Sequence, residues 1–265
     1  MKPFLTGTAM FVLITAVFAA TAAARGPGGR TFHGAVFSAG VSGDPNAAPG
    51  PAITSATPAL DSLVRVSTDQ GVSGPLTAEE LTTSGRVTLD SETEPMASVN
   101  QSNRSNVVGI WQEDRWTSGG SRNLVLGTSF DSGQTWTNIP LQGVSILAGG
   151  EFQRVTDPWV DFGPGNRVYA FSLGFDDTGP DNGLFVSTST DGGLTWGAQV
   201  PVIVDRQFEF FNDKNALAAD DWSSSPNRGN VYLAWDRLIE DPLGAPFIGT
   251  YTGPAMFSRS TDGGA

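Results

Sequence analysis

One eight-residue motif occurs twice in this chain, and its first half occurs a third time. Residues 129–136 read Ser-Phe-Asp-Ser-Gly-Gln-Thr-Trp, residues 189–196 read Ser-Thr-Asp-Gly-Gly-Leu-Thr-Trp, and residues 260–264 read Ser-Thr-Asp-Gly-Gly. The three aspartates are 60 and 71 residues apart. Recurrence at such a period is typical of an array of similar supersecondary units. The chain is therefore expected to consist of repeated units with one motif in each.

Each motif is surrounded by short runs rich in Val, Tyr, Phe and Trp, which are typical of strands. First strands are expected at 94–99, 157–162 and 213–218, second strands at 106–112, 166–172 and 230–236, third strands at 124–128, 184–188 and 256–259, and fourth strands at 136–141 and 196–204. Four strands joined by turns make a propeller blade. Gly, Pro, Asn and Asp clusters interrupt any helical periodicity. The sequence predicts an all-β fold: a β-propeller of four-stranded antiparallel blades in an incomplete arc of about three to four blades.

The motif has the residues that a tight turn between two strands requires. An aspartate accepts hydrogen bonds from backbone N–H groups a few residues on, and glycine adopts the positive φ that closes the turn. Threonine returns the chain to an extended conformation, and tryptophan fills the space between sheets. We therefore expect structural roles for Ser129, Asp131, Gly133, Thr135, Trp136, Ser189, Asp191, Gly193, Thr195, Trp196, Ser260, Asp262 and Gly264.

The Ser-x-Asp-x-Gly-x-Thr-Trp pattern at 129–136 and 189–196 resembles the Asp-box of bacterial-neuraminidase-type repeats, which occur in the sialidase-like superfamily of β-propellers. The resemblance covers about residues 94–264. It implies a propeller fold and, for a true sialidase, an arginine triad, an aspartate acid/base and a tyrosine nucleophile assisted by a glutamate. The Arg-Ile-Pro motif of such enzymes is missing, because Arg65 and Arg86 are not followed by Ile-Pro. The third motif stops before its Thr-Trp, so a C-terminally truncated propeller is expected.

The candidate catalytic residues are the acids that open the expected first strands, namely Glu94, Asp157 and Asp213. Innermost strands line the central channel of a propeller, so equivalent acids from different blades are expected to converge there. Paired carboxyl groups are the usual equipment of glycosidases. Our hypothesis is that Asp157 or Asp213 acts as a general acid/base, helped by Arg154 or Lys214. The alternative is that these acids only cap turns and strand ends.

Two loops carry acidic pairs, Asp176-Asp177 and Asp220-Asp221, whose oxygens are of the type that binds Ca²⁺. Neither pair belongs to a recognised calcium loop, so solvated loop charge is the simpler interpretation. Aromatic rings also flank several turns and are candidates for stacking on sugars, although core packing is their commoner use. These are Trp116, Phe210, Phe211 and Trp222.

Composition excludes several classes of chemistry. The chain has no cysteine and one histidine, His33, which excludes thiolate sites and multi-histidine metal sites and argues against a Ser-His-Asp triad. A net charge of −12 disfavours binding to nucleic acid or to anionic membranes. We expect no cofactor, no bound metal and no nucleic-acid partner.

The N-terminus has the pattern of an export signal. Lys2 supplies the positive region, residues 10–20 are apolar, and small residues at 20–24 form a cleavage site. We expect a signal peptide at 1–24, a flexible Gly/Pro/Ala-rich leader at 25–58 and the propeller at 59–265, in a secreted or periplasmic protein without membrane attachment after cleavage.

Two functions stay open at this stage. One is a glycoside hydrolase, of exo-sialidase type, that acts on extracellular glycans. The other is a non-catalytic extracellular propeller that binds a polysaccharide or a protein. A carbohydrate is the partner common to both, and the sequence gives no oligomeric state.

Overall fold

The computed structural model describes residues 64–68, 75–78, 80–240 and 251–264. The expected signal peptide, the whole expected leader and His33 lie outside these residues. The described part contains thirteen strands, two short 3-10 turns at Glu80–Thr82 (η1) and Ile146–Ala148 (η2), and no α-helix. No helix in these ranges is long and apolar enough to cross a membrane.

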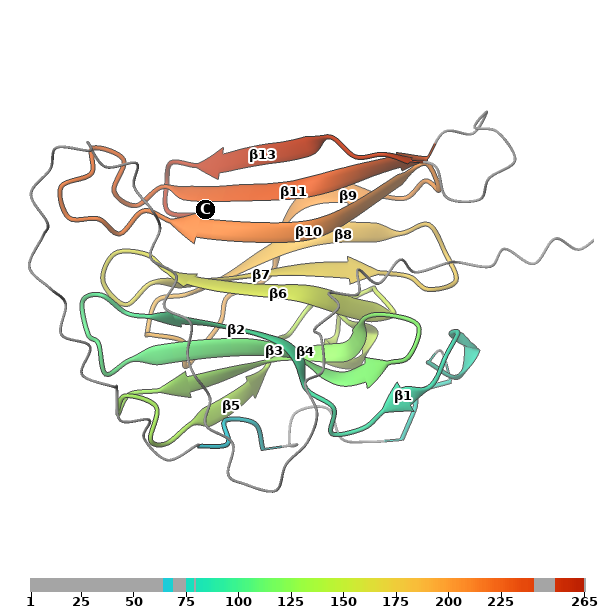
Figure 1. The fold of residues 1–265 in the computed structure, drawn as a ribbon, viewed down its shortest axis with the longest axis horizontal. Coiled ribbons are helices and arrows are strands. Elements are labelled where there is room, and N and C mark those ends of the chain that lie inside the picture. The colour runs from blue at the N-terminus through green and yellow to red at the C-terminus, as the bar shows by residue number, and fades with distance from the viewer. Residues whose placement is uncertain (1–63, 69–74, 79, 241–250, 265) are drawn as a thin grey trace, which may run out of the picture. The chain divides into compact units, whose positions relative to one another are not determined.

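The strands form a nine-stranded and a four-stranded antiparallel sheet (Figure 1). The nine-stranded sheet consists of two consecutive meanders that are joined at the residue pair Ser121–Val155. We call these two meanders sheet 1 and sheet 2, and the four-stranded sheet is sheet 3. Sheet 1 contains β2 (Thr93–Val99), β3 (Val107–Trp116), β4 (Ser121–Ser129) and β5 (Thr137–Pro140), with β1 (Val87–Thr88) paired to the end of β3. Sheet 2 contains β6 (Arg154–Phe162), β7 (Val168–Phe175), β8 (Asn182–Ser189) and β9 (Val200–Asp205). In sheet 3, β10 (Phe210–Ala219) pairs with β11 (Val231–Glu240), which pairs in turn with β12 (Tyr251–Thr252) and β13 (Ala255–Ser260).

The strands lie where the sequence predicts them, with two systematic differences. First and second strands extend further at one end, so that β3 continues to Trp116 and β6 starts at Arg154. The fourth strand of sheet 2 starts at Val200 and not at Trp196, because the tryptophan still belongs to the turn and donates its indole N–H to the Gly193 carbonyl. The extra length of the first and second strands lies at the end opposite the repeated turns.

The repeated turns hold their aspartates in the same hydrogen-bond pattern. Asp131 Oδ1 accepts the backbone N–H groups of Gln134 at 3.0 Å and Thr135 at 2.9 Å, and its Oδ2 accepts the Thr135 hydroxyl at 2.6 Å. The Ser129 hydroxyl donates to Asp131 at 2.8 Å and accepts from Gly133 N–H at 2.9 Å. Residues 189–196 repeat all of these bonds. The turn therefore uses both carboxylate oxygens of its aspartate.

These bonds also lower the pKa values of the turn aspartates. The Thr135 hydroxyl and N–H are the main causes that lower the pKa of Asp131 to about 2. For Asp191, burial acts to raise the pKa, but the hydrogen bonds from Thr195 and Ser189 outweigh it and lower the pKa to about 2. Both groups are thus carboxylates fixed in the turn, which is not the state that a proton donor needs.

Each later turn docks on the preceding sheet. Thr128 of sheet 1 donates its hydroxyl to the Gly193 carbonyl of the second turn at 2.8 Å. In the same way, Arg167 and Tyr169 of sheet 2 donate to the Gly263 carbonyl of the third turn at 2.8 and 3.0 Å. The glycines of these turns therefore have a second task besides turn geometry, since they let one sheet approach the next closely.

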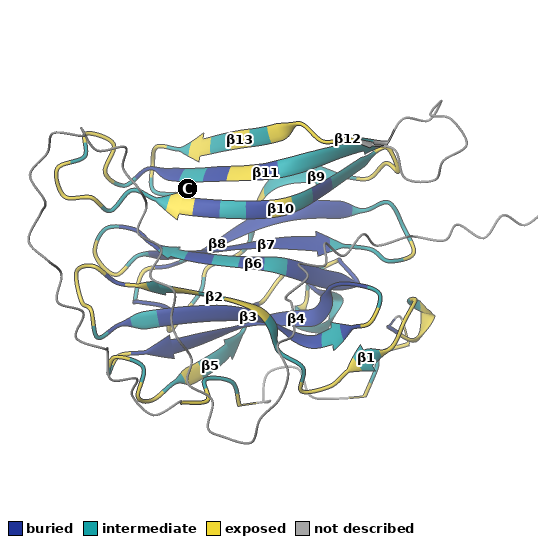
Figure 2. Cartoon of the chain, viewed as in Figure 1, coloured by how far each residue is buried: buried dark blue, intermediate teal, exposed yellow. Residues whose placement is uncertain are grey.

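The core lies between the sheets, where strand centres are buried (Figure 2). One apolar cluster joins sheets 1 and 2 and includes Ile110, Leu126, Val160 and Phe162. A second joins sheets 2 and 3 and includes Phe171, Leu184, Leu217, Leu233 and Trp235. Each sheet therefore packs face to face on its neighbour, as aligned sheets in all-β proteins do.

The first strands of the three sheets lie next to one another in the order β2, β6, β10. Asp161 in the middle strand accepts the Ser98 hydroxyl of β2 at 2.9 Å and the Ala219 N–H of β10 at 3.0 Å. Stacked meander sheets with adjacent first strands are the arrangement of propeller blades. The predicted all-β propeller fold is confirmed, with three consecutive blades in the described residues.

A buried ion cluster fastens the segment before the first blade. The Arg122 guanidinium, fully buried on β4, pairs with Glu80 of η1 at 2.6 Å and with Asp114 of β3 at 3.2 Å. Burial acts to raise the pKa of Glu80, but the hydrogen bonds and charge of Arg122 and the Thr77 N–H lower it. Because removal of one member leaves buried charge without compensation, this cluster ties η1 strongly to the sheet.

Candidate functional site

The first strand of every blade contains the same irregularity near its start. The register of pairing shifts between Thr93 and Met96 in β2, between 156 and 159 in β6, and between 213 and 216 in β10. Inside each bulge one non-glycine residue has a positive φ: Glu94 at 52°, Asp157 at 48° and Lys214 at 51°. Left-handed backbone is costly for such residues and clusters at functional sites. The three bulges are therefore equivalent candidate positions for a functional site.

This equivalence corrects the sequence alignment by one residue. Glu94 and Asp157 do occupy matching positions, but the third member of the set is Lys214, and Asp213 lies one position earlier, where the other blades have threonine. The sequence alignment was wrong because it matched acids by type. The positive φ angles at these three positions could not be predicted from the sequence, because none of the three residues is a glycine.

The bulges nevertheless bring Asp157 and Asp213 together across two blades. The backbone N–H of Lys214 donates to Asp157 Oδ2 at 3.1 Å and to Asp213 Oδ1 at 2.9 Å, so both carboxyl groups accept the same N–H. The Lys214 ammonium lies 3.6 Å from Asp157 Oδ2. Asn215 donates its amide to the Asp157 carbonyl at 2.9 Å, and Thr156 donates its hydroxyl to Asp157 Oδ1 at 2.9 Å.

The charges and burial of this cluster raise the pKa values of Asp213 and Lys214. Burial, and then the negative charge and hydrogen bonding of Asp157, raise the pKa of Asp213. The charge of Asp157 is also the largest cause that raises the pKa of Lys214, followed in the same direction by Asp213 and Glu94. A carboxyl group whose pKa is raised by burial and by a neighbouring carboxyl group is a candidate proton donor.

Glu94 joins the same network through Gln112 of β3, a buried residue that the sequence did not single out. Gln112 Nε2 donates to Glu94 Oε2 at 2.5 Å and to the Thr156 hydroxyl at 3.1 Å, and that hydroxyl donates onward to Asp157. The Arg115 guanidinium donates to Gln112 Oε1 at 2.7 Å. One amide thus links the acids of two blades. The only sequence signal for this site is the acid-proline pair at 94–95 and again at 157–158.

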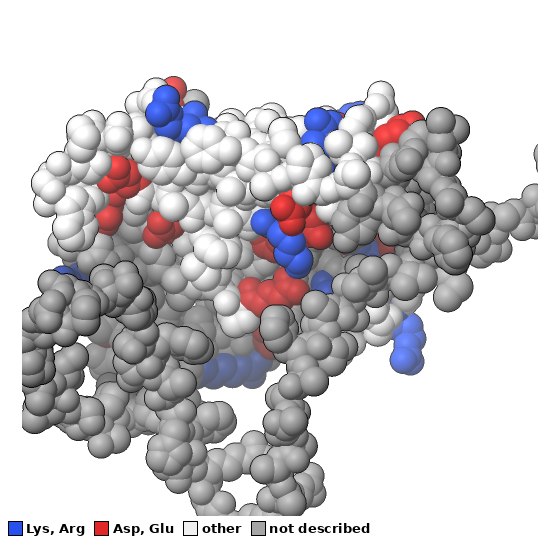
Figure 3. Space-filling model, turned by 45° about the horizontal axis from the view of Figure 1, so that its top comes forward, with Lys and Arg blue, Asp and Glu red and all other residues white. Residues whose placement is uncertain are grey.

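The bulges line an open pocket of about 280 Å³. Its wall is made by the bulge residues of all three first strands: Glu94, Pro95, Met96, Asp157, Pro158, Trp159, Lys214, Asn215 and Ala216. On the face drawn in Figure 3, acidic and basic side chains gather in small clusters on a largely uncharged surface. A second, smaller pocket of about 170 Å³ shares Pro95 and continues to Val66 and Trp111.

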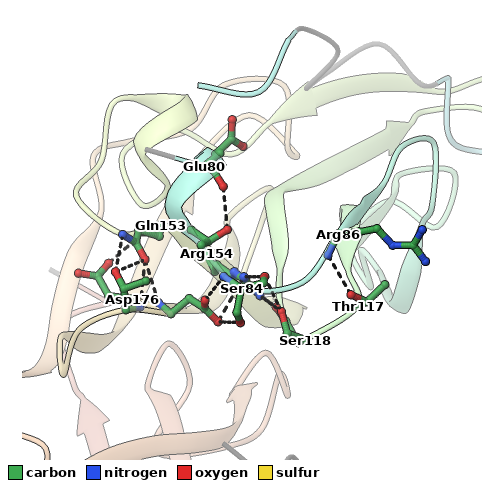
Figure 4. Close-up of polar contacts among 12 residues, drawn as sticks. Glu80, Ser84, Arg86, Thr117, Ser118, Gln153, Arg154 and Asp176 are labelled. Carbon is green, nitrogen blue, oxygen red and sulfur yellow. Dashed lines mark hydrogen bonds and ion pairs between the residues drawn. The ribbon is translucent and has the colours of Figure 1, made fainter. Parts of the chain in front are cut away.

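Arg154 does not take part in this site, contrary to the sequence hypothesis. Its side chain is fully buried and donates to the Ser118 hydroxyl at 2.8 Å, the Gly119 carbonyl at 2.7 Å and the Ser84 carbonyl at 2.5 Å (Figure 4). Burial lowers its pKa to about 10, against the charge of Asp177, which acts to raise it. Arg154 holds the segment around Ser84 in place, and Lys214 is the cation that accompanies the acids.

The acidic pairs also have structural partners. Asp177 pairs with Arg154 at 3.2 Å and accepts the Ser84 backbone N–H at 2.5 Å, and Asp220 accepts the Ser225 hydroxyl at 2.6 Å. No group of three or more His, Cys, Asp or Glu suited to a metal ion occurs in the described ranges.

The aromatic candidates divide between packing and exposure. Trp116 is buried, with the Arg154 guanidinium 4.6 Å from its ring centroid, and Phe211 packs edge-on against Phe175 at 5.8 Å. Phe210 lies 4.1 Å from the Arg237 guanidinium. Trp222 is 71% exposed, but it lies in the β10–β11 loop, at the rim of the repeated turns and away from the bulges. The aromatic ring that does line the bulge pocket is Trp159.

The comparisons with known proteins gave matches only among solved structures. No family model matches the chain, and no curated protein matches it in sequence. An α-L-arabinanase of Penicillium chrysogenum bound to arabinobiose matches with a TM-score of 0.44 and 16% identity, over 64% of this chain and 46% of that one. The Trypanosoma rangeli sialidase bound to the inhibitor DANA matches with a TM-score of 0.39 and 15% identity, over 64% and 31%.

A structure from the GH130 family of mannoside phosphorylases, described with hydrolases that target β-1,2 mannosidic linkages in Candida mannan, matches with a TM-score of 0.38 and 13% identity, over 62% and 48%. This chain thus spans half or less of the length of the structures it matches.

Proposed function

We propose that this protein is an exported glycoside hydrolase of the sialidase-like superfamily and that its reaction takes place in the pocket between the three first-strand bulges. The observation that carries the proposal is the pair Asp157 and Asp213, whose carboxyl oxygens accept the same Lys214 N–H at 3.1 and 2.9 Å. Hydrolysis of a glycosidic bond needs one carboxyl group that donates a proton and one that is ionised. The raised pKa of Asp213 beside Asp157 supports this pair as the proton donor.

The roles follow from position. Asp157 lines the pocket and Asp213, which is not among the lining residues, accepts the same Lys214 N–H, so the pair acts as one proton donor with Asp157 at the sugar. Glu94 lines the pocket from the neighbouring blade, held by Gln112, and is the carboxylate for the second role, as base or nucleophile. Lys214 limits the charge that accumulates around the pair.

Turnover of fluorogenic glycosides tests this proposal. The resemblance makes an α-sialoside the first substrate to try, together with neutral furanosides and pyranosides. Asp157→Asn and Glu94→Gln are expected to reduce release of the fluorophore by about 10²-fold or more. Glu209→Gln, an exposed acid that does not line the pocket, is the matched control and is expected to keep full activity. Equal activity of all variants would remove the proposal.

A non-catalytic propeller that binds a polysaccharide or protein is the second candidate. It is favoured by the ion pair between Lys214 Nζ and Asp157 Oδ2 at 3.6 Å, because an ion pair at the pocket also suits binding of a ligand without catalysis. The Arg-Ile-Pro motif, missing from the sequence, points the same way. Saturable binding on a glycan array without turnover of the same glycan, by the intact chain, would select this candidate.

Export is proposed from the N-terminal pattern of Lys2, the apolar residues 10–20 and the small residues at 20–24. N-terminal sequencing of protein recovered from outside the cytoplasm is expected to start within a few residues of Ala24. Recovery only inside the cells with Met1 intact would contradict export.

A further inference from the structure

The charges around the bulge pocket are unevenly distributed. Glu94 and Asp157 line it, and Asp213 accepts the backbone N–H of the lining residue Lys214. Lys214 is the one cation among the described lining residues, and its ammonium group already lies 3.6 Å from Asp157. A ligand that enters the pocket therefore meets more negative than positive charge.

The arginines on the same rim have other partners. Arg115 donates to the Gln112 amide at 2.7 Å, and Arg237 pairs with Asp205 at 2.7 Å while its guanidinium lies over the Phe210 ring. Arg154 is buried. Recognition of a sugar carboxylate normally uses a bidentate arginine, because the guanidinium fork matches the two oxygens. No arginine is among the described residues that line this pocket.

The rest of the lining suits the faces of an uncharged sugar. Pro95, Met96, Pro158, Trp159 and Ala216 supply apolar surface for the C–H groups of a ring. The carboxyl oxygens of Glu94 and Asp157 can accept hydrogen bonds from sugar hydroxyls, and such bonds are stronger where the acceptor is charged. A neutral sugar can use both kinds of contact, whereas a sugar acid brings its negative charge into a cluster of three acids with one lysine.

We propose that the bulge pocket selects uncharged sugars and excludes sialic and uronic acids. The inference rests on the proposed carbohydrate function and names its substrate class. Lys214 then serves the acids of the site and not the ligand. The sialidase resemblance favours a sialoside as the substrate, whereas this pocket favours a neutral glycan.

Matched neutral and acidic glycans on one array test the inference with the intact chain. Pairs that differ by CH₂OH against COO⁻, such as galactosides and galacturonides, keep ring shape constant. The neutral member is expected to bind, or to be hydrolysed, about 10-fold to 100-fold better, and sialosides are expected to be silent. Preference for the acidic members overturns the inference but leaves the carbohydrate function standing. Silence of every glycan removes both.

Reversal of charge at one lining residue gives a second, independent test. Glu94→Lys is expected to fold, because Lys214 already occupies the equivalent left-handed position with a φ of 51° against 52° for Glu94. It is expected to shift the ratio of acidic to neutral binding at least about 10-fold toward the acids. Glu209→Lys makes the same charge change outside the lining and is expected to leave the ratio unchanged. An unchanged ratio in Glu94→Lys, with an unchanged melting temperature, contradicts the inference.

Discussion

Replacement of Gly193 by alanine tests how one blade packs on the next. Gly193 has a φ of +100°, and a Cβ placed on it would lie 2.7 Å from Val108 Cγ2 and 2.8 Å from Thr128 Oγ1, both in buried residues of the preceding blade. Left-handed backbone costs an alanine about 1–2 kcal/mol. Overpacking of a buried contact adds about 1–3 kcal/mol. Gly193→Ala is therefore expected to lower the free energy of unfolding by about 2–5 kcal/mol.

Gly165→Ala is the matched control, because Gly165 has a φ of +73° but nothing within 4 Å of the added Cβ. It is expected to cost only the backbone contribution of about 1–2 kcal/mol. Urea unfolding followed by tryptophan fluorescence measures both values. Equal losses in the two variants would refute the idea that the turn glycine is needed for close approach between blades, because the packing contribution would then be zero.

Three further predictions concern single groups. The lowered pKa of Asp191 in the folded state stabilises the wild type above pH 3.8, and this stability is lost as the pH falls toward about 2. Asp191→Asn is expected to lack this contribution, which acid titration followed by circular dichroism measures. Arg122→Met is expected to cost about 3–5 kcal/mol in chemical unfolding, because Glu80 stays buried without its partner, and a loss below about 1 kcal/mol would contradict the account. Gln112→Leu is expected to weaken binding of the best neutral glycan about tenfold, because Glu94 loses its donor, while Gln207→Leu on the surface leaves binding unchanged; calorimetry measures both.

The strands and turns were predictable because they are local. The Ser-x-Asp-x-Gly-x-Thr-Trp motif requires only residues within one turn, so Asp131 and Asp191 could be assigned to turn structure before any contact between blades was known. Runs of Val, Phe and Trp between the turns then place the strands. The second task of Gly193, approach to Thr128 of the preceding blade, depends on residues 65 positions away and left no local signal.

The candidate site was predictable only in part. Acid residues at the starts of the first strands were found by type, and Asp157 and Asp213 do meet. The bulge that aligns Lys214 with Glu94 was missed, because non-glycine residues with positive φ carry no reliable sequence signal. Arg154 was assigned to the site because it lies close to Asp157 in the sequence. Its burial depends on carbonyl and hydroxyl acceptors that only the folded chain brings together.

The most direct test of the account is the acidity of Asp213, measured by NMR titration of the aspartate carboxyl carbons. The account predicts that Asp213 titrates above the value of 3.8 that is ordinary for aspartate, and that Asp157→Asn lowers its pKa, since the charge and hydrogen bonding of Asp157 contribute to the shift. A pKa of Asp213 at or below 3.8 in the wild type, unchanged in Asp157→Asn, would contradict the claim that the two bulges build one proton-sharing pair.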